Sequence, residues 1–403
     1  MTTNVVVTGL GATTPLGGDV ATTWEGLLAG RSGIRAIEEE WAAGLPIRMA
    51  GRLHVEPGEV LDRVQARRLD RCEQVAIVAA REAWADAGRP EVEPERLAVV
   101  VGTGTGGALT ILGQHDVLRT SGVRKVSPHT VPMLMANGPA AWVSIELGAR
   151  GGAHTPVSAC ASGAEAIAMG LDLIRLGRAD VVVAGGAEAC IHPLPLAGFA
   201  QAKAHSTRND EPQRASRPFD VDRDGFVIGE GSVLVVLERA DFAAARGARA
   251  HAVLAGAGIT SDAHHITAAH PDGQTRAMRL ALAAAGLAPQ DIHHVHAHAT
   301  STPSGDLTEA ESVAEAVGLH PVVTATKSMT GHLFGAAGAM GALATVLAIR
   351  DGVVPATANL DRLDPRIPLD VVAGEPRKGP VPAALTNSFG FGGHNASLVF
   401  TEA

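Results

Sequence analysis

The sequence predicts an α/β protein made of two similar halves, residues 1–247 and 248–403. Two strand-like runs, at 5–8 and 252–255, are each followed by the pattern Gly-x-Gly-x-Thr. Each half also contains a helix-like segment that ends in glycine, a short loop with proline, and then an apolar β-rich run. Because these elements recur in the same order, we expect a duplicated core rather than an array of short repeats.

The helix-like segments lie at 75–86 in the first half and 278–285 in the second, where apolar residues recur at three- and four-residue spacing. Strand-like runs follow them at 97–101 and 292–298. Most of the strands are continuous runs of Val and Ala rather than alternating ones, which is typical of strands that are buried on both faces. We therefore expect mostly parallel sheets that are covered by helices.

Length and composition bound the class of protein. At about 150 residues per domain, 403 residues predict two or three domains or one duplicated core. The chain is 46% hydrophobic and 19% charged, which excludes a disordered protein. Subtracting 42 acidic from 33 basic residues gives a net charge of −9, so long-range repulsion opposes binding to a nucleic acid backbone. We expect no nucleic acid partner.

The cysteines and the N-terminus indicate the compartment. Three cysteines, Cys72, Cys160 and Cys190, are too few and too scattered for a disulfide framework or a zinc site. The start, MTTNVVVTGLG, lacks a basic region followed by a long apolar one, and no apolar run reaches about 18 residues. We expect a cytoplasmic protein that does not associate with membranes.

Cys160 is a candidate nucleophile. It lies in the segment VSACASGAEA, which leads from a short strand into a helix. Unpaired N–H groups and the positive end of the helix dipole stabilise a thiolate at such a position, which could lower the thiol pKa to about 7. The competing interpretation is a small buried side chain used for packing, which fits Cys72 and Cys190.

Two histidine-containing segments could serve this cysteine. His298 lies in HAHATSTPSGD, where a strand ends in a loop, and His332 ends KSMTGH, just before a segment of small residues. Strand ends and helix starts face one rim of an α/β fold, so these side chains can meet in one pocket. Near the C-terminus, the glycines of NSFGFGGHN allow backbone N–H groups to approach a ligand.

The segments VSACASGAEA, HATSTPSGD, KSMTGH and NSFGFGGHN occur in this order and resemble the four signature blocks of β-ketoacyl-acyl carrier protein synthases. The chain is most similar to the elongating type II (FabF-like) condensing enzymes. The resemblance runs from VVVTGLGATTPLG to the last strand and so covers essentially the whole chain. It implies a duplicated thiolase-like fold, layered α-β-α-β-α with two mainly β sheets. The N-terminal half would carry the nucleophile and the C-terminal half the histidines.

The resemblance implies roles for five residues by matching position. Cys160 matches the acyl-accepting nucleophile, and His298 and His332 match the pair that assists decarboxylation of the malonyl thioester. Two histidines, rather than one histidine and an asparagine, are typical of elongating enzymes. Lys327 and Glu309 match an ion pair of the family that orients the histidines.

The resemblance also implies positions around the reacting groups. Phe391 matches the gating phenylalanine, and its backbone N–H and that of Cys160 match the oxyanion hole. Ile111 matches a side chain at the acyl pocket on the dimer side. Five basic residues match carrier-protein docking positions at the pocket entrance: Arg67, Arg68, Arg124, Lys125 and Arg208.

The implied activity is the decarboxylative Claisen condensation of malonyl-acyl carrier protein with an acyl chain on Cys160, in fatty-acid elongation. The alternative is the ketosynthase of a type II polyketide or polyene pathway, which uses the same reacting residues. The implied partners are acyl carrier protein and a second copy of the chain, or a chain-length factor in the polyketide case. The chemistry implies no cofactor and no metal.

Three positions depart from the family pattern. Ala299 replaces a glycine, Ala161 replaces threonine or serine, and His394 replaces the commoner threonine. None of the three removes a reacting group. They predict a change in pocket shape rather than a loss of activity.

Other interpretations start from single motifs. His294, His296 and His298 alternate along one strand, a spacing suited to zinc. Gly102, Gly104 and Gly107 form a literal G-x-G-x-x-G, but no acidic residue follows at the distance a dinucleotide site requires, so a tight turn is expected. A third interpretation is a non-catalytic chain-length factor, a class that lacks the nucleophilic cysteine.

Overall fold

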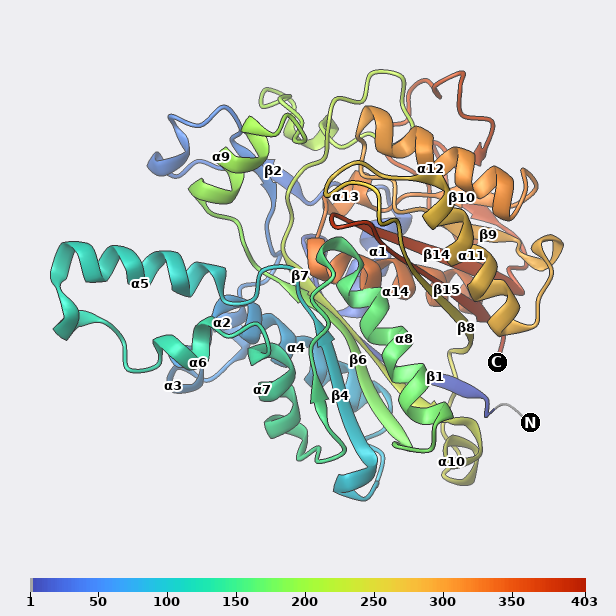
Figure 1. Ribbon diagram of the computed structural model, residues 1–403, viewed down its shortest axis with the longest axis horizontal. Coiled ribbons are helices and arrows are strands. Elements are labelled where there is room, and N and C mark those ends of the chain that lie inside the picture. Colours follow the sequence, from blue (N-terminus) through green and yellow to red (C-terminus); the bar gives the residue numbers. More distant parts are fainter. Residues whose placement is uncertain (1–2) are drawn as a thin grey trace.

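The computed structural model describes residues 3–403, which form alternating helices and strands (Figure 1). The strands are β1 (Val5–Thr13), β2 (Ile34–Ala36), β3 (Met49–Gly51), β4 (Leu97–Gly102), β5 (Ala153–His154), β6 (Val181–Glu188), β7 (Gly231–Arg239), β8 (Ala252–Ser261), β9 (His294–His296), β10 (Val322–Thr324), β11 (Val353–Val354), β12 (Asp370–Val371), β13 (Arg377–Lys378), β14 (Ala383–Gly390) and β15 (His394–Thr401).

The helices are α1 (Val20–Leu28), α2 (Pro57–Val60), α3 (Arg63–Ala66), α4 (Arg71–Asp86), α5 (Ala108–Ser121), α6 (Thr130–Leu134), α7 (Gly138–Leu147), α8 (Ser162–Arg175), α9 (Pro193–Gln201), α10 (Ala240–Ala245), α11 (Pro271–Ala285), α12 (Pro303–Ala316), α13 (Lys327–Thr330) and α14 (Ala337–Asp351). Short 3₁₀ turns precede the two central helices: η4 (Ala159–Ala161) before α8, and η7 (Phe334–Ala336) before α14.

Eleven strands form one mixed sheet with an internal repeat of strand order. The order is β12-β10-β9-β14-β15-β8-β1-β7-β6-β4-β5. Counted outward from the centre, the first half contributes β1-β7-β6-β4-β5 and the second half contributes β8-β15-β14-β9-β10. Each neighbouring pair of the first series is parallel or antiparallel in the same way as the corresponding pair of the second. The two predicted sheets are therefore two half-sheets, joined through two residue pairs of β1 and β8. The predicted α/β class and the duplication are confirmed.

The expectation of mostly parallel sheets is wrong. Parallel pairing holds among β4, β5 and β6 and among β9, β10, β12 and β14, but β1, β7, β8 and β15 pair antiparallel. The continuous apolar runs reflect burial of both faces of each strand. Burial of both faces does not require parallel neighbours, so the pattern alone could not give the strand direction.

Successive residues of a strand enter different cores, which makes the fold layered. Val182 of β6 and Ala384 of β14 share one core, which contains α8 and α14. Val183 packs into a second core with α4 and α7, and Leu385 into a third with α11 and α12. Helices α8 and α14 thus lie between the two half-sheets, and α4, α7, α11 and α12 cover the outer faces. The predicted α-β-α-β-α layering is confirmed.

The repeated Gly-x-Gly pattern has a packing role in both halves. The strands run through the glycines rather than ending before them, and one helix crosses each strand at this point. A Cβ at Gly11 would lie 2.0 Å from the carbonyl oxygen of Ala79 on α4. A Cβ at Gly258 would lie 2.0 Å from the carbonyl oxygen of Ala277 on α11. The glycines therefore allow the same close packing of helix on strand twice.

The predicted boundary between residues 247 and 248 falls in the loop between α10 and β8. No element of regular secondary structure is cut there. The division into two domains at this point stays a prediction.

One segment, Phe334–Asp351, is long and apolar enough by length and composition to cross a membrane, and 89% of it is buried inside the fold. It comprises η7 and α14 and occupies the middle layer. A helix that is apolar on all sides is expected where both neighbouring layers are protein.

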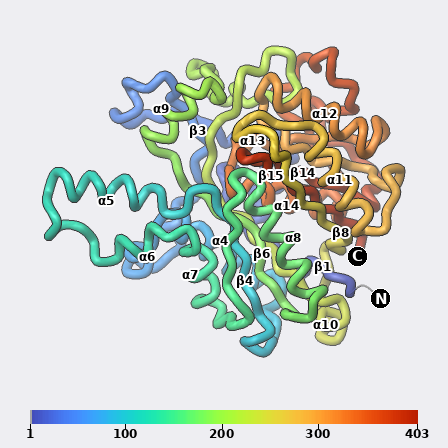
Figure 2. Tube along the Cα trace, viewed as in Figure 1, coloured from blue at the N-terminus to red at the C-terminus, as the bar shows by residue number. Residues whose placement is uncertain are grey.

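Helices α5 and α6 project from the body of the molecule, at the left of the view (Figure 2). Only Thr110 of α5 is buried. Four apolar side chains of the two helices and the residue that follows them are exposed: Ile111, Leu118, Val131 and Met135. This projecting arm leaves an apolar surface without cover in the single chain.

Candidate active site

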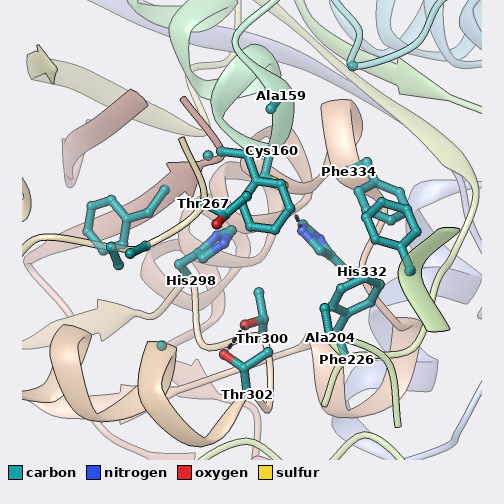
Figure 3. A pocket seen from close by; sticks show the side chains of 18 of the residues that line it. Ala159, Cys160, Ala204, Phe226, Thr267, His298, Thr300, Thr302, His332 and Phe334 are labelled. Carbon is teal, nitrogen blue, oxygen red and sulfur yellow. Dashed lines mark hydrogen bonds between the residues drawn. The ribbon is translucent and has the colours of Figure 1, made fainter. Parts of the chain in front are cut away.

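A cavity of about 570 Å³ opens where the N-terminal ends of α8 and α14 meet. Its walls come from both halves of the chain. Cys160 lines it from the first half, and His298 and His332 line it from the second (Figure 3). The predicted nucleophile and both predicted histidines thus face one crevice, as the sequence motifs indicated.

Cys160 lies in the turn η4, which connects directly to α8. The preceding strand, β5, ends at His154, so a loop separates it from the cysteine instead of the direct strand-to-helix passage that the sequence predicted. Ala159 has φ 51°, in the left-handed region that costs a residue with a side chain about 1–2 kcal/mol. Ser162 Oγ donates to the Ala159 carbonyl at 2.7 Å and Ser388 Oγ to the Cys160 carbonyl at 2.8 Å, which fixes the turn.

Small residues bring the two central helices together. A Cβ at Gly163 of α8 would lie 2.8 Å from the carbonyl oxygen of Gly335. A Cβ at Gly338 of α14 would lie 2.6 Å from the backbone nitrogen of Ala164. Because neither glycine carries a side chain, the helix starts almost touch, and the groups just ahead of them meet.

His332 contacts the nucleophile. Its Nε2 lies 3.0 Å from Cys160 Sγ (Figure 3). The ring packs against Phe334 at a centroid distance of 4.7 Å and stands edge to face with Phe226 at 5.7 Å. Burial, with the positive charge of Lys327, holds the pKa of His332 well below its usual value, so the imidazole is neutral.

His298 follows β9 and is anchored through its backbone. Glu309 accepts the N–H of His298 at 2.7 Å and that of Ala299 at 2.6 Å. Lys327 donates to the His298 carbonyl, and its Nζ lies 3.4 Å from His298 Nδ1. The rings of His298 and His332 stand edge to face with centroids 5.4 Å apart. Burial, with the charge of Lys327, also holds the pKa of His298 well below its usual value.

Lys327 and Glu309 lie close to His298 but do not form the expected ion pair. Within residues 3–403 no salt bridge joins them, and they act on His298 from two sides instead. Burial lowers the pKa of Lys327 to about 8, and Glu309, Cys160 and Asp306 oppose this shift. At neutral pH the ammonium is therefore mostly charged. The sequence could not distinguish a direct ion pair from two groups that share a third residue.

The expected thiolate at Cys160 is wrong for the resting protein. Burial raises the pKa of the thiol to about 12. The charge of Lys327 and the neighbouring N–H groups of Phe391 and Cys160 lower it, whereas Glu188 raises it. The cost of placing a charge away from water exceeds the stabilisation from the helix N-terminus. The resting pair is a neutral thiol beside a neutral imidazole.

Phe391 lies in the turn between β14 and β15, with its side chain 43% exposed and on the cavity wall. Gly392 and Gly393 follow with φ of 90° and 74°, values that favour glycine. The backbone N–H of Phe391 lies beside the Cys160 sulfur. The predicted gating and oxyanion roles stay predictions, and this position is compatible with both.

Ile111 does not reach the cavity. It lies on the projecting arm, is 47% exposed, and is absent from the cavity lining of this chain. The expected acyl-pocket contact is therefore not made within one chain, because α5 points away from the body.

The five predicted docking residues fall into two groups. Arg208 is only half-buried, but its guanidinium donates to the Asp222 carbonyl at 2.8 Å and lies 3.8 Å from Asp224. It is thus engaged within the chain. The other four are exposed, and none of them forms a salt bridge within residues 3–403: Arg67, Arg68, Arg124 and Lys125.

The sequence interpretation missed several cavity residues. Thr300 and Thr302, joined by a hydrogen bond of 3.0 Å, lie inside a motif that could have indicated them. Lys203, exposed and with φ 55°, lies at the cavity in a loop without any motif. Five of the eight phenylalanines also line the cavity, a concentration that only the fold reveals: Phe199, Phe226, Phe334, Phe389 and Phe391.

The zinc interpretation does not fit the histidine strand. His294 Nδ1 lies 3.0 Å from the Val322 carbonyl, and His296 Nε2 lies 2.9 Å from Thr326 Oγ1. Among residues 3–403, no group of three or more His, Cys, Asp or Glu side chains is arranged to hold a metal ion.

Comparison with known proteins agrees with this geometry. The family model "Beta-ketoacyl synthase, N-terminal domain" matches residues 2–243, and "Beta-ketoacyl synthase, C-terminal domain" matches residues 251–361. The chain is 49% identical over 402 residues to the 3-oxoacyl-[acyl-carrier-protein] synthase 2 of Mycobacterium tuberculosis, covering 98% of this chain and 96% of that protein. It is 43% identical over 406 residues to the Staphylococcus aureus protein of the same name, covering 99% and 98%.

Solved structures agree over the full length. The ishigamide ketosynthase/chain length factor has a TM-score of 0.94 and 35% identity, covering 100% of both chains. A β-ketoacyl synthase from Burkholderia phymatum has a TM-score of 0.93 and 35% identity, again covering 100% of both. A type II polyketide ketosynthase in complex with its acyl-carrier protein, AntDE:AntF, has a TM-score of 0.91 and 29% identity, covering 100% of both.

Proposed function

The chain belongs to the β-ketoacyl synthase family, and we propose that it catalyses an elongation step of fatty-acid synthesis. It is an acyltransferase of the condensing type. In this proposal Cys160 holds the growing acyl chain as a thioester, and malonyl-acyl carrier protein supplies two carbons with loss of CO2. One observation carries the proposal: Cys160 Sγ lies 3.0 Å from His332 Nε2, and the His298 ring stands 5.4 Å from that of His332.

In the loading step, Cys160 Sγ forms a bond to the thioester carbonyl carbon, and the bond from that carbon to the pantetheine sulfur breaks. Because the thiol is neutral and His332 is neutral, Nε2 can accept the thiol proton as the sulfur attacks. The proton then passes to the departing pantetheine sulfur. The N–H groups of Phe391 and Cys160 lie beside the sulfur, where they can donate to the carbonyl oxygen as it becomes negative.

In the condensation step, loss of CO2 places negative charge on the malonyl thioester oxygen. The Lys327 ammonium lies 3.4 Å from His298 Nδ1, which favours the tautomer with its proton on Nε2. His332 Nδ1 is buried and has no hydrogen-bond partner within residues 3–403, so its tautomer is not locked. Each Nε2–H donor aimed at the enolate oxygen contributes on the order of 3 kcal/mol. The enolate carbon then bonds to the acyl carbon, and Cys160 Sγ leaves as a thiolate. It takes up a proton from water, because the original thiol proton left with the pantetheine sulfur of the first carrier.

The cavity supports a substrate with a polar arm and an apolar chain. Thr300, Thr302 and Ser304 give one part of its wall hydroxyl groups. Phe199, stacked on Phe334 at a centroid distance of 5.2 Å, makes another part apolar. These surfaces fit the amide-rich pantetheine arm and the hydrocarbon of an acyl group, respectively.

For the carrier protein we propose docking on the four basic residues that are free within the chain: Arg67, Arg68, Arg124 and Lys125. Lys203 at the cavity mouth joins this set. Local positive charge would attract an acidic carrier even though the whole chain has a net charge of −9. We assign Arg208 a weaker part because its guanidinium is engaged within the chain.

We propose that the chain works as a homodimer. The exposed apolar side chains of the projecting arm, Ile111 among them, support a second copy as its cover. In that arrangement the arm would complete the partner's acyl pocket, which gives Ile111 the role that it lacks in one chain.

A polyketide or polyene ketosynthase is the second candidate, with a chain-length factor as the partner. Two structures of similar fold, the ishigamide ketosynthase/chain length factor and AntDE:AntF, favour it. Their identities of 35% and 29% are below the 43–49% to 3-oxoacyl synthases. The first candidate is therefore preferred. Either way we propose a cytoplasmic enzyme, a compartment suited to its free thiols at Cys72, Cys160 and Cys190.

The test is acyl transfer followed by condensation. The enzyme is incubated with carrier proteins that bear saturated acyl chains of graded length, and the peptide containing Cys160 is weighed by mass spectrometry. We expect a mass increase equal to the acyl group, then its loss and release of the 3-oxoacyl product when malonyl-carrier protein is added. An unmodified Cys160 with every carrier contradicts the proposal. Loading by poly-β-keto chains in place of saturated ones favours the second candidate.

A further inference from the structure

Glu188 is a buried carboxylate on the cavity wall to which the mechanism above assigns no task. It ends β6 and has no exposed surface. Its Oε2 accepts the backbone N–H of Gly104 at 2.7 Å and that of Gly335 at 3.0 Å. Its Oε1 accepts the N–H of Thr105 at 3.2 Å and the hydroxyls of Thr105 at 2.6 Å and Thr103 at 3.2 Å. Among residues 3–403 no cation forms a salt bridge with it.

These contacts favour the ionised form. Backbone N–H groups can only donate, and each Glu188 oxygen receives at least one of them. Burial holds the pKa of Glu188 above its usual value, and the hydrogen bonds from Thr105, Gly335, Gly104 and Thr103 oppose this shift. A carboxylate that accepts several donors is stabilised as an anion without a neighbouring cation.

The glycine-rich loop after β4 is built around this anion. Its literal G-x-G-x-x-G pattern, which can bind a phosphate in other folds, here surrounds a carboxylate of its own chain. A Cβ at Gly104 would lie 2.7 Å from Glu188 Oε2. A Cβ at Gly335 would lie 2.5 Å from the backbone nitrogen of Gly104. Both glycines are therefore needed for the two halves to close on one carboxylate.

Glu188 also acts on the nucleophile. Five charged or titratable groups of the described residues face the Cys160 thiol or share its cavity: Lys327, Glu188, Cys190, His298 and His332. The two histidines and the Cys190 thiol are neutral, so the fixed charges are Lys327 from the second half and Glu188 from the first. Lys327 lowers the pKa of the thiol and Glu188 raises it.

We propose that Glu188 is a positioning residue for the condensation. Its hydrogen bonds tie the Thr103–Thr105 loop of the first half to Gly335 of the second. Its negative charge opposes the positive charge of Lys327 near Cys160. This inference rests on the proposed function, because it assigns Glu188 a role in the proposed condensation. The tie holds η7 and the start of α14, so it fixes His332 relative to the sulfur. The charge adds to the effect of burial, which keeps the resting sulfur protonated, and opposes the charge of Lys327.

The charge is tested with Glu188→Gln, which keeps the size and removes the charge. The rate at which iodoacetamide alkylates Cys160 is followed against pH, with mass spectrometry to separate this thiol from Cys72 and Cys190. We expect the profile to move to lower pH, with alkylation near neutral pH on the order of tenfold faster. The matched control is Glu238→Gln, which removes another buried carboxylate, one that pairs with Arg246 and is not among the groups that act on Cys160. Its profile should match that of the wild type.

A profile that stays in place or moves to higher pH in Glu188→Gln overturns the proposal. The tie is tested with Glu188→Asp, which keeps the charge but is one methylene too short to reach both Gly104 and Gly335. We expect its condensation rate to fall at least about tenfold while Cys160 still resists alkylation near neutral pH. If Glu188→Gln does not fold, this variant decides, and wild-type condensation overturns the proposal. Alkylation needs no carrier protein, so a wild type inactive with every acyl carrier would defeat the proposed function and leave the charge test intact.

Discussion

The starts of the two central helices occupy equivalent places in the duplicated fold, but they carry different chemistry. Cys160 lies in the 3₁₀ turn before α8, and His332 lies just ahead of the 3₁₀ turn before α14. Crossing of the helices at Gly163 and Gly338 brings these groups to 3.0 Å. Duplication thus supplies two equivalent helix ends that converge, and the sequence places a nucleophile on one and a proton acceptor or donor on the other.

The two helix ends also differ in the nearest fixed charge. The first half contributes Glu188 and the second contributes Lys327, and they shift the pKa of the Cys160 thiol in opposite directions. Because both helix starts carry the same dipole, the dipole cannot account for this difference. The backbone position decides where a reacting group lies, whereas burial and the nearest charges decide whether it holds a proton.

The largest effect is expected from removing the reacting group at the start of α8 while the histidines of the second half stay in place. Cys160→Ala eliminates the sulfur, so acyl transfer and condensation should fall at least about 10³-fold. Malonyl decarboxylation should persist in part, because it depends on the histidines of the other half. Release of CO2 and of 3-oxoacyl product from malonyl- and acyl-carrier protein measures the two separately. Condensation at the wild-type rate would remove Cys160 from its assigned role.

The reciprocal change acts on the second helix end. His332→Ala removes one enolate donor and should slow malonyl decarboxylation by more than about tenfold. The helices still cross at their glycines, so the melting temperature should change little by comparison. Decarboxylation is measured in the Cys160→Ala background as well, where loading cannot mask it. An unchanged rate in both backgrounds would contradict the donor role.

The charge contributed by the second half predicts a pH dependence. The pKa of Lys327 is about 8, so its ammonium loses the proton as pH rises through this value and no longer donates to His298 Nδ1. The condensation rate should therefore decline as pH rises from about 7 to about 9.5. Ionisation of the Cys160 thiol, with a pKa of about 12, lies above this range. Lys327→Met should be slower throughout and lack the decline near pH 8, and a decline that persists in this variant would assign it to another group.

The smallest expected effect concerns the crossing itself. Gly338→Val places a side chain where even a Cβ lies 2.6 Å from the Ala164 nitrogen, which should destabilise the fold by about 1–3 kcal/mol. Gly113→Ala on α5 is the control: no atom lies within 4 Å of its added Cβ, and helix propensity predicts a gain of about 0.5–1 kcal/mol. Urea unfolding measures both. Equal stabilities would mean that the close approach at Gly338 is not required.

Much of the fold follows from local sequence. The repeated Gly-x-Gly strands predicted the duplication, and the structure adds that Gly11 and Gly258 admit a helix at the same point of each half. Strand direction could not be predicted in this way, because continuous apolar runs record burial on both faces and not the neighbour's direction.

The candidate site, like the fold, could be predicted from the sequence only in part. The four ordered motifs, through their resemblance to the signature blocks of the family, indicated Cys160, His298 and His332. Only the tertiary structure decided that the thiol is neutral, that Lys327 and Glu309 meet at His298 instead of each other, and that Arg208 is engaged within the chain. Glu188 had no signal in the sequence, because its five donors come from segments far apart along the chain.

The sequence by itself therefore determined which groups can react and in which half each one lies. The fold determined their protonation and their partners. The physical reason is that desolvation and Coulomb interactions depend on distances through space, which residue order does not contain.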